Sequence, residues 1–274
     1  FMVTVVIAAV MYGTGEEATF FYPFGIAFDN NSNLFVSDSY NGYIRKLTSA
    51  AVVTTIVGSG NGYRDGYGDA VKLYTPLLMK FGPDGRLYGC LGAKKHIFAL
   101  NLTSGEVETI VENVQPNDMV ITDRGHIYIT ETQKKQVTWV DVKTKAVRAA
   151  DTGLAGPNGI SLSPDQGTLA VSESQGQFVW TYRINPDGAL DAKGSYMTLR
   201  RPIDPKGEFK PAELPPYLPR SSGDGMTSDT LGRYYVTSAL GIQIFDPTGR
   251  LCGVIDKPVP DKGVTSCVLA GPKR

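Results

Sequence analysis

Cysteine and histidine are scarce in this sequence of 274 residues, and neither sign of charge predominates. The three cysteines, Cys90, Cys252 and Cys267, are far apart and form no C-x-x-C pair. Neither a disulfide framework nor a zinc ribbon is therefore expected. Because 27 basic residues balance 27 acidic ones with no block of either sign, there is no electrostatic basis for binding nucleic acid or an acidic membrane surface. We expect neither as a partner.

Two catalytic classes are also poorly supported. The chain has two histidines and no serine within a G-x-S-x-G elbow, which argues against a Ser-His-Asp hydrolase. His96 stands at a turn and His126 at the start of a strand, where a structural role is the simpler interpretation. Paired glycosidase-like carboxylates are equally unspecific, because turns account for most of the Asp and Glu.

Long apolar runs and helical periodicity are missing too. The longest apolar run, Val3 to Tyr12, is too short to span a bilayer and lacks the basic flank of a signal peptide, so we predict a strand there. No long 3.6-residue period is present, which argues against a parallel sheet with crossover helices. The 31 glycines, 17 prolines and 14 tyrosines instead favour many short strands joined by tight turns.

What the chain does contain is a repeat of roughly forty residues. A Gly or Asn turn followed by an apolar strand occurs five times, at Asn33–Val36, Gly85–Tyr88, Gly125–Tyr128, Gly167–Ala170 and Gly232–Tyr235. Four short strands fit within each period, which is typical of a propeller blade. A barrel or sandwich would need no such repeat. We predict an all-β, six-bladed β-propeller that forms a single domain over residues 1–274.

The sixth blade has to be assembled from both ends of the sequence. Val264–Leu269 is interpreted as its innermost strand and Met2–Ala9 as its outermost. This closure would remove exposed sheet edges. No residues are left for the two middle strands, so the blade is expected to be incomplete.

Two insertions interrupt the period. The glycine-rich segment Gly58–Pro76 contains no G-x-x-x-x-G-K-[ST] phosphate loop and is interpreted as a connection between blades. The segment Arg200–Ser222 holds six prolines, which resist strand pairing. Because it ends just before Asp224, it is predicted to form a lid over the channel mouth.

Three short motifs stand at the same phase of three repeats, before the first strand. They are Pro116-Asn117-Asp118-Met119, Pro157-Asn158-Gly159-Ile160 and Gly223-Asp224-Gly225-Met226. The first strand of each blade lines the channel of a propeller, so Asn117, Asn158 and Asp224 are predicted to meet at one mouth. Amide and carboxylate oxygens suit Ca²⁺, Mg²⁺ or Mn²⁺. Asn and Asp are also common in turns, so any one of these residues alone could simply cap a turn. Their shared position within the repeat favours a site.

These motifs resemble the gluconolactonase and senescence-marker-protein (regucalcin) family from Pro76 to Gly271. The resemblance is carried by Pro116-Asn117-Asp118, by Pro157-Asn158-Gly159 with Ser163-Pro164-Asp165, by Ser222-Gly223-Asp224-Gly225-Met226, and by Gly241-Ile242-Gln243-Ile244-Phe245-Asp246-Pro247. Tyr22–Pro76 is similar instead to an NHL repeat, in Pro23-Phe24-Gly25-Ile26-Ala27-Phe28-Asp29, Tyr43-Ile44-Arg45-Lys46-Leu47 and Asp65-Gly66-Tyr67-Gly68-Asp69-Ala70. Both families are propellers.

The resemblance implies a divalent cation held by two asparagines, an aspartate and a glutamate. Calcium is the first expectation, with magnesium, manganese or zinc as alternatives. Asn117, Asn158 and Asp224 match as metal ligands, and Asp224 matches the catalytic residue that activates water. The glutamate does not match, because Phe24 occupies that register. Asp224 would then be the one anionic ligand, so the site would carry about one negative charge less than the family's site. This predicts weak binding of the cation.

Two functions are the main candidates, beside related propeller chemistries such as organophosphate hydrolysis or strictosidine-synthase-like condensation. One is a metal-dependent hydrolase of a small-molecule lactone or ester, in which the cation polarises the carbonyl and Asp224 activates water. The other is a non-catalytic ligand-binding or scaffold propeller that has lost the glutamate ligand. A propeller fold by itself does not separate them.

Overall fold

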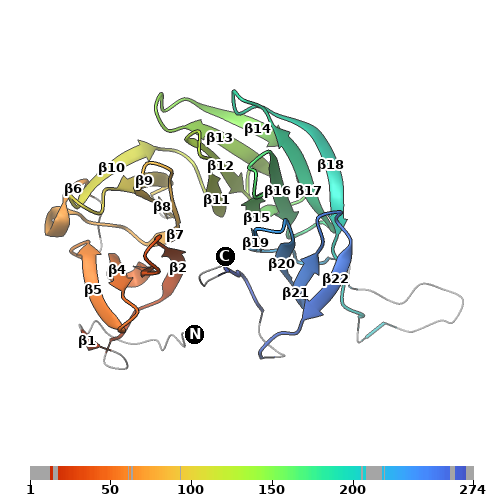
Figure 1. The fold of residues 1–274 in the computed structure, drawn as a ribbon, viewed down its shortest axis with the longest axis horizontal. Coiled ribbons are helices and arrows are strands. Elements are labelled where there is room, and N and C mark those ends of the chain that lie inside the picture. Colours follow the sequence, from red (N-terminus) through yellow and green to blue (C-terminus); the bar gives the residue numbers. More distant parts are fainter. Residues whose placement is uncertain are drawn as a thin grey trace, which may run out of the picture. The chain divides into compact units, whose positions relative to one another are not determined.

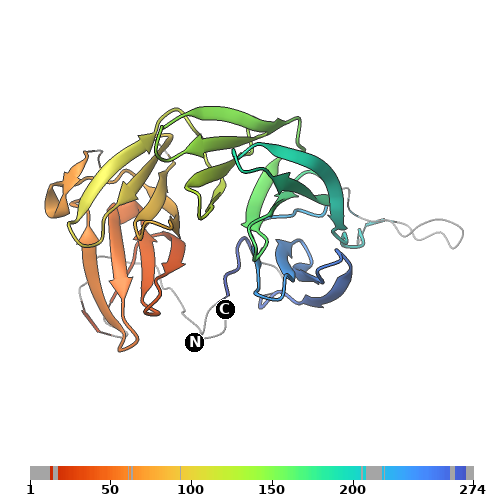
Figure 2. The same cartoon turned by 45° about the horizontal axis from the view of Figure 1, so that its top comes forward.

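The computed structural model of the chain describes residues 13–14, 18–60, 62, 64–92, 94–204, 206–207, 218, 220–259 and 263–269. Its strands form five antiparallel sheets, each made of strands consecutive in the chain (Figure 1). This is an all-β propeller architecture in which each sheet is one blade. Figure 2 shows the same blades from a second direction.

Each blade contains four main strands. Blade 1 has β2 (Pro23–Phe28), β3 (Leu34–Asp38), β4 (Tyr43–Leu47) and β5 (Val52–Val57). Blade 2 has β7 (Pro76–Phe81), β8 (Leu87–Leu91), β9 (His96–Leu100) and β10 (Glu106–Val111). Blade 3 has β11 (Asp118–Ile121), β12 (His126–Glu131), β13 (Gln136–Asp141) and β14 (Val147–Thr152). Blade 4 has β15 (Pro157–Leu162), β16 (Thr168–Glu173), β17 (Phe178–Ile184) and β18 (Leu190–Thr198). Blade 5 has β19 (Met226–Ser228), β20 (Tyr234–Ser238), β21 (Gly241–Phe245) and β22 (Leu251–Ile255).

The predicted repeat corresponds to these blades. The five apolar anchor strands are the second strands β3, β8, β12, β16 and β20. No α-helix occurs in the described residues, whose helical elements are the two short 3₁₀ turns η2 (Ser39–Asn41) and η3 (Gly68–Ala70). The described part of the chain thus has no helix of a length and apolarity that would span a membrane.

The sixth blade is not confirmed, since five blades are present in the described residues. The prediction of an innermost strand at Val264–Leu269 is wrong, because the described residues 263–269 form no strand. They contact blade 5 instead, where the Gly225 amide donates to the Thr265 carbonyl (2.8 Å). The predicted outermost strand Met2–Ala9 lies outside the described residues, as does most of the predicted lid Arg200–Ser222.

Two short strands extend blades 1 and 2. β1 (Gly13–Thr14) pairs with β5, and β6 (Gly66–Tyr67) pairs with β10. The glycine-rich segment predicted as a plain connection therefore supplies an edge strand as well. Within this segment, Arg64 and Lys72 form an isolated antiparallel β-bridge. An added strand at a blade's outer edge covers backbone groups that would otherwise face water.

Tight turns join the strands because aspartate and glycine stand where the turn geometry needs them. In the β19–β20 turn, Asp229 Oδ1 accepts hydrogen bonds from the amides of Leu231 (3.0 Å) and Arg233 (2.9 Å). Gly232 adopts φ +78°, a left-handed conformation that costs glycine little. These hydrogen bonds and the glycine conformation fix the register of β19 and β20.

The described chain divides into two compact units, each with its own apolar core. The first unit holds blades 1 and 2 together with Ile121–Ile127 and Val140–Val147, and its core includes Phe35, Ile44 and Phe98. The second holds Asn117–Val120, Tyr128–Trp139 and blades 4 and 5. Cores in the second unit centre on Tyr128, Ile160 and Val171, and on Met197, Met226 and Phe245.

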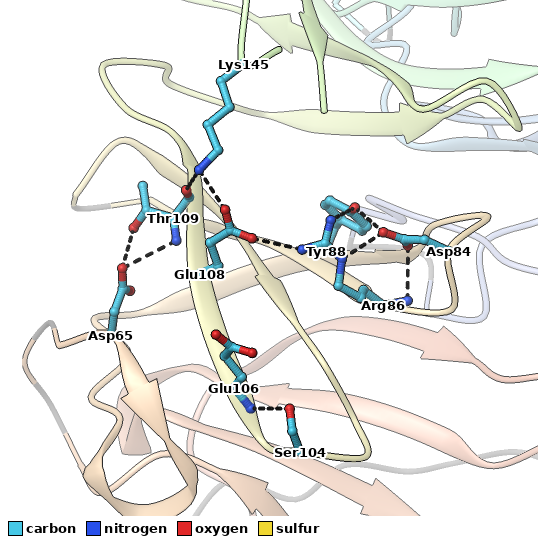
Figure 3. A network of polar contacts seen from close by, with 9 residues as sticks. All are labelled: Asp65, Asp84, Arg86, Tyr88, Ser104, Glu106, Glu108, Thr109 and Lys145. Carbon is cyan, nitrogen blue, oxygen red and sulfur yellow. Dashed lines mark hydrogen bonds and ion pairs between the residues drawn. The ribbon is translucent and has the colours of Figure 1, made fainter. Parts of the chain in front are cut away.

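A polar network on the first unit links side chains far apart in sequence (Figure 3). Glu108 on β10 accepts from Arg86 (3.0 Å) and from Lys145 (2.6 Å), and Arg86 also pairs with Asp84 (2.7 Å). The hydrogen bond from Lys145 is the main cause that holds the Glu108 pKa below its usual value. Because these groups are partly exposed, the network contributes modestly to stability.

Candidate functional site

Asn117, Asn158 and Asp224 occupy equivalent positions in blades 3, 4 and 5. Asn117 directly precedes β11, and its amide donates to the Thr130 carbonyl on β12 (2.8 Å). Asp224 precedes β19, and its amide donates to the Thr237 carbonyl on β20 (2.9 Å). Asn158 is the second residue of β15. The predicted common phase is therefore confirmed, and all three residues belong to the second compact unit.

In blades 3 and 4, a buried hydroxyl on the second strand ties these chain segments together. Thr130 Oγ1 accepts from the Asp118 amide (3.0 Å) and donates to the Asn158 carbonyl of the next blade. Ser172 Oγ repeats the arrangement one blade on: it accepts from the Gly159 amide (2.9 Å) and donates to the Asp224 carbonyl (2.8 Å). Both hydroxyls are completely buried. They set the spacing of the three segments that carry the candidate ligands.

Gly159, next to Asn158, lets the chain segments that contain Asn158 and Asp224 approach each other closely. A Cβ built on Gly159 would lie 2.2 Å from the Asp224 carbonyl oxygen. That distance is far inside van der Waals contact, so any larger residue would push the two segments apart. The Pro-Asn-Gly motif thus reflects packing of blade 4 on blade 5 beside the candidate site.

Replacing Thr130 by valine is expected to destabilise the fold by about 1–3 kcal/mol, because it leaves the Asp118 amide and the Asn158 carbonyl without their buried hydroxyl partner. The matched control is Thr130→Ser, which keeps the hydroxyl and removes one methyl group, at a cost of about 1 kcal/mol. Urea denaturation measures both. Equal losses for the two variants would show that the hydroxyl does not hold the segments.

The carboxylate of Asp224 has an unusual environment. Burial raises its pKa to about 6, the Gly225 amide (2.9 Å) partly opposes that rise, and the negative charge of Asp118 adds to it. Asn117 is exposed and Asn158 and Asp224 are partly exposed, so all three side chains remain accessible to a solute. An aspartate that loses its proton near pH 6 is suited to exchange protons with a bound water.

Asp118 is the site residue that sequence reasoning missed. It belongs to the Pro-Asn-Asp motif, in which Asn117 is the predicted ligand. Asp118 is 6% exposed, and its carboxylate accepts from the amides of Met119 (2.8 Å) and Ile160 (3.3 Å). It therefore adds a second buried negative charge near Asp224. The sequence feature that could have identified Asp118 is an acidic residue directly before the apolar residues Met119–Ile121.

The donor chemistry of this group fits a hard divalent cation. Two amide side chains and one carboxylate would supply oxygen ligands, and the charge of Asp118 acts on Asp224. In the described residues no three His, Cys, Asp or Glu side chains gather into a possible metal centre. Amide oxygens would therefore have to take part in holding an ion here. A cation would also relieve the repulsion between Asp118 and Asp224.

The position equivalent to Asp224 carries no carboxylate in blades 1 and 2. Phe24, the second residue of β2, is 60% exposed, and Leu77 is the second residue of β7. Both belong to the first compact unit. Phe24 thus lies at the register where the resemblance to the family predicts a glutamate. Its effect on cation binding stays a prediction.

Repeated four-stranded blades and oxygen-bearing side chains at the starts of three inner strands define a propeller with a candidate cation site. The family of this propeller follows from its sequence: the chain belongs to the SMP-30/Gluconolactonase/LRE-like family, whose profile matches residues 24–274. The predicted resemblance to gluconolactonases and regucalcin is confirmed.

Curated relatives are named for lactone chemistry. The chain is 26% identical over 211 residues to a gluconolactonase of Zymomonas mobilis, covering 69% of this chain but 56% of that protein. It is 25% identical over 257 residues to lactonase drp35 of Staphylococcus haemolyticus, covering 87% and 70% of the two chains. The chain thus spans little more than half of the Zymomonas protein.

Solved structures support the propeller fold. A gluconolactonase of Xanthomonas campestris matches with a TM-score of 0.66 and 18% identity, covering 92% of this chain and 80% of that one. A calcium-binding regucalcin from Agrobacterium tumefaciens matches with a TM-score of 0.65 and 13% identity, covering 99% and 85%. At such identities the likeness concerns the fold.

Proposed function

We propose that this chain hydrolyses the ester bond of a small lactone at the site formed by Asn117, Asn158 and Asp224. The observation that carries the proposal is Asp224, a partly buried carboxylate with a raised pKa of about 6 beside two amide-bearing segments. Membership of a family with curated lactonases supports the same reaction class.

A divalent cation, calcium first, would be held by Asn117, Asn158 and Asp224 and would supply Lewis-acid polarisation of the lactone carbonyl. Asp118 contributes negative charge behind these ligands. The hydrogen bonds of Thr130 and Ser172 keep the ligand-bearing segments at a fixed spacing. Such support by neighbouring groups commonly changes metal affinity tenfold to a hundredfold.

In its charged form Asp224 accepts a proton from water. The resulting hydroxide oxygen bonds to the lactone carbonyl carbon, and the ring C–O bond breaks. Protonated Asp224 then returns its proton to the leaving alkoxide, so that one lactone and one water give one hydroxy acid. This role requires a group whose pKa lies close to the working pH, as that of Asp224 does.

The pH dependence follows from that role. Since Asp224 is active when deprotonated, kcat/KM for lactone opening is expected to rise about tenfold per pH unit below pH 6 and to level off above it. Bound calcium would favour the charged carboxylate and move this midpoint lower. Stopped-assay rates from pH 4.5 to 8, corrected for spontaneous opening, measure it. Rates that fall as pH rises through this range would argue against Asp224 as the base.

The rival function is a non-catalytic ligand-binding propeller, which is favoured by the aromatic Phe24 at the register where the resemblance predicts a glutamate ligand. A panel of five- and six-membered lactones, assayed with calcium and with manganese, separates the two. Turnover of any lactone above the spontaneous rate supports the hydrolase. Cation or ligand binding without turnover supports the binding protein.

A further inference from the structure

A cleft of about 590 Å³ lies in the second compact unit, between blades 4 and 5. Its walls are formed by the end of β18 with the residues that follow it, and by the turn before β21. The lining residues are Gln177, Thr198, Leu199, Arg200, Arg201, Pro202, Ile203 and Leu240. We name it the Arg200 cleft. Two of these residues are cationic and none is anionic, although the whole chain is neutral.

The strand register places this cleft at the same sheet edge as the candidate site. Pro157, beside Asn158, pairs with Glu173 at the end of β16, and Phe178 at the start of β17 pairs with Thr198 at the end of β18. In blade 5, Ser238 at the end of β20 pairs with Gly241 at the start of β21, and Leu240 lies in the turn between them. The same end of β20 holds the backbone of Asp224, whose amide donates to the Thr237 carbonyl. Lining residues and site residues therefore share one edge of these two blades.

Leu199 connects the cleft to the Asp224 segment. Its Cδ1 would lie 2.7 Å from a Cβ built on Gly223, the residue before Asp224. Leu199 also lines the cleft. One leucine side chain thus separates the cleft from the chain segment that carries the proposed base. The cleft is therefore a close neighbour of the Asp224 segment.

The backbone of Arg200 is held rigidly, while its side chain is exposed. Gln243, which is completely buried, accepts from the Arg200 amide (2.8 Å) and donates to the Arg200 carbonyl (3.0 Å). No ion pair joins the Arg200 guanidinium to a residue that the structure describes. A fixed backbone with a planar, permanently charged side chain, beside a cleft whose described lining residues include no acid, is suited to bind a carboxylate.

We propose that the Arg200 cleft binds the carboxylate of an acidic lactone, or of the hydroxy acid formed from it, with Arg200 as the residue that selects the charged substrate. This proposal rests on the lactonase function for the identity of the substrate, but anion binding can be measured without turnover. The apolar side chains of Ile203 and Leu240 would contact the carbon skeleton next to that carboxylate.

The test that needs no catalysis is calorimetric titration with sodium glucarate, a hydroxylated dicarboxylate without a lactone ring, in metal-free buffer. Wild type is expected to bind it, Arg200→Gln to bind it at least tenfold more weakly, and Arg200→Lys to lie between the two. The matched control Arg250→Gln removes the same charge from an exposed turn at the other end of blade 5, and it should bind like wild type. No glucarate binding by wild type, or equal binding by Arg200→Gln, overturns the proposal.

The second test compares kcat/KM for a lactone bearing a free carboxylate with that for its uncharged amide. The ratio is expected to fall at least tenfold in Arg200→Gln, mainly through KM for the acidic lactone, and to stay at the wild-type value in Arg250→Gln. An unchanged ratio in Arg200→Gln contradicts the proposal. If neither lactone is hydrolysed but glucarate binding depends on Arg200, the lactonase function fails while the cleft is supported.

Discussion

Asp224→Asn is expected to be more stable than wild type above pH 6 in metal-free buffer and to lose lactone hydrolysis by about a thousandfold. Burial raises the Asp224 pKa to about 6 in the folded state, compared with about 3.9 when unfolded. Because the folded pKa is higher, the stabilising effect of the bound proton is complete below the unfolded pKa and is lost as pH rises through 6. At pH 8 the charged carboxylate costs about 1–2 kcal/mol, after allowance for its partial exposure.

Urea denaturation at pH 4 and pH 8, with a lactone assay at pH 8, measures both effects. The gain in stability of Asp224→Asn should appear at pH 8 and shrink at pH 4. Asp229→Asn is the matched control: Asp229 has a lowered pKa despite its burial, because Arg233 and turn amides stabilise its charge. That variant should lose stability at pH 8 and keep activity. An Asp224→Asn protein that still hydrolyses lactones would contradict the assigned base.

Calcium at a hundred times its dissociation constant is expected to stabilise wild type by about 2.7 kcal/mol, and Asn158→Asp is expected to bind calcium at least tenfold more tightly. The substitution keeps an oxygen ligand and adds the charge that the site lacks. A unit charge a few ångströms from the ion contributes about 1–4 kcal/mol, depending on the local dielectric.

Thermal unfolding over a calcium series gives the apparent affinities of both proteins. Thr230→Asp adds the same charge in an exposed turn at the opposite end of β19 and should leave the affinity near that of wild type. Equal affinities for Asn158→Asp and Thr230→Asp would show that the ion does not bind beside Asn158.

Asn117→Ala removes one oxygen ligand, so it should weaken calcium binding tenfold to a hundredfold.

The parts of the fold that local sequence determines could be predicted. Turn residues such as Asp229 and Gly232 fix register over a few positions, and alternation then defines the strand that follows, so the repeat and the phase of Asn117, Asn158 and Asp224 were recognisable. The resemblance to the family was confirmed over most of the chain. The single-domain assignment over residues 1–274 stays a prediction.

Features that depend on contacts between distant segments could not be predicted in this way. Asp118 accepts a hydrogen bond from Ile160, 42 residues away, and its effect on the Asp224 pKa arises from that packing. The Arg200 cleft likewise requires Gln243 to hold the Arg200 backbone. The strand expected at Val264–Leu269 is absent, because a strand forms only where a neighbouring strand pairs with it, and a short apolar segment does not determine that pairing.

The most direct test of a cation-dependent hydrolase site is lactone turnover by metal-stripped protein, measured before and after calcium is added, in wild type and in Asp224→Asn. Calcium is expected to restore turnover in wild type, with half-maximal activation at the dissociation constant found by thermal unfolding, and to restore none in Asp224→Asn. Turnover that is independent of calcium and survives the loss of the Asp224 carboxylate would contradict it.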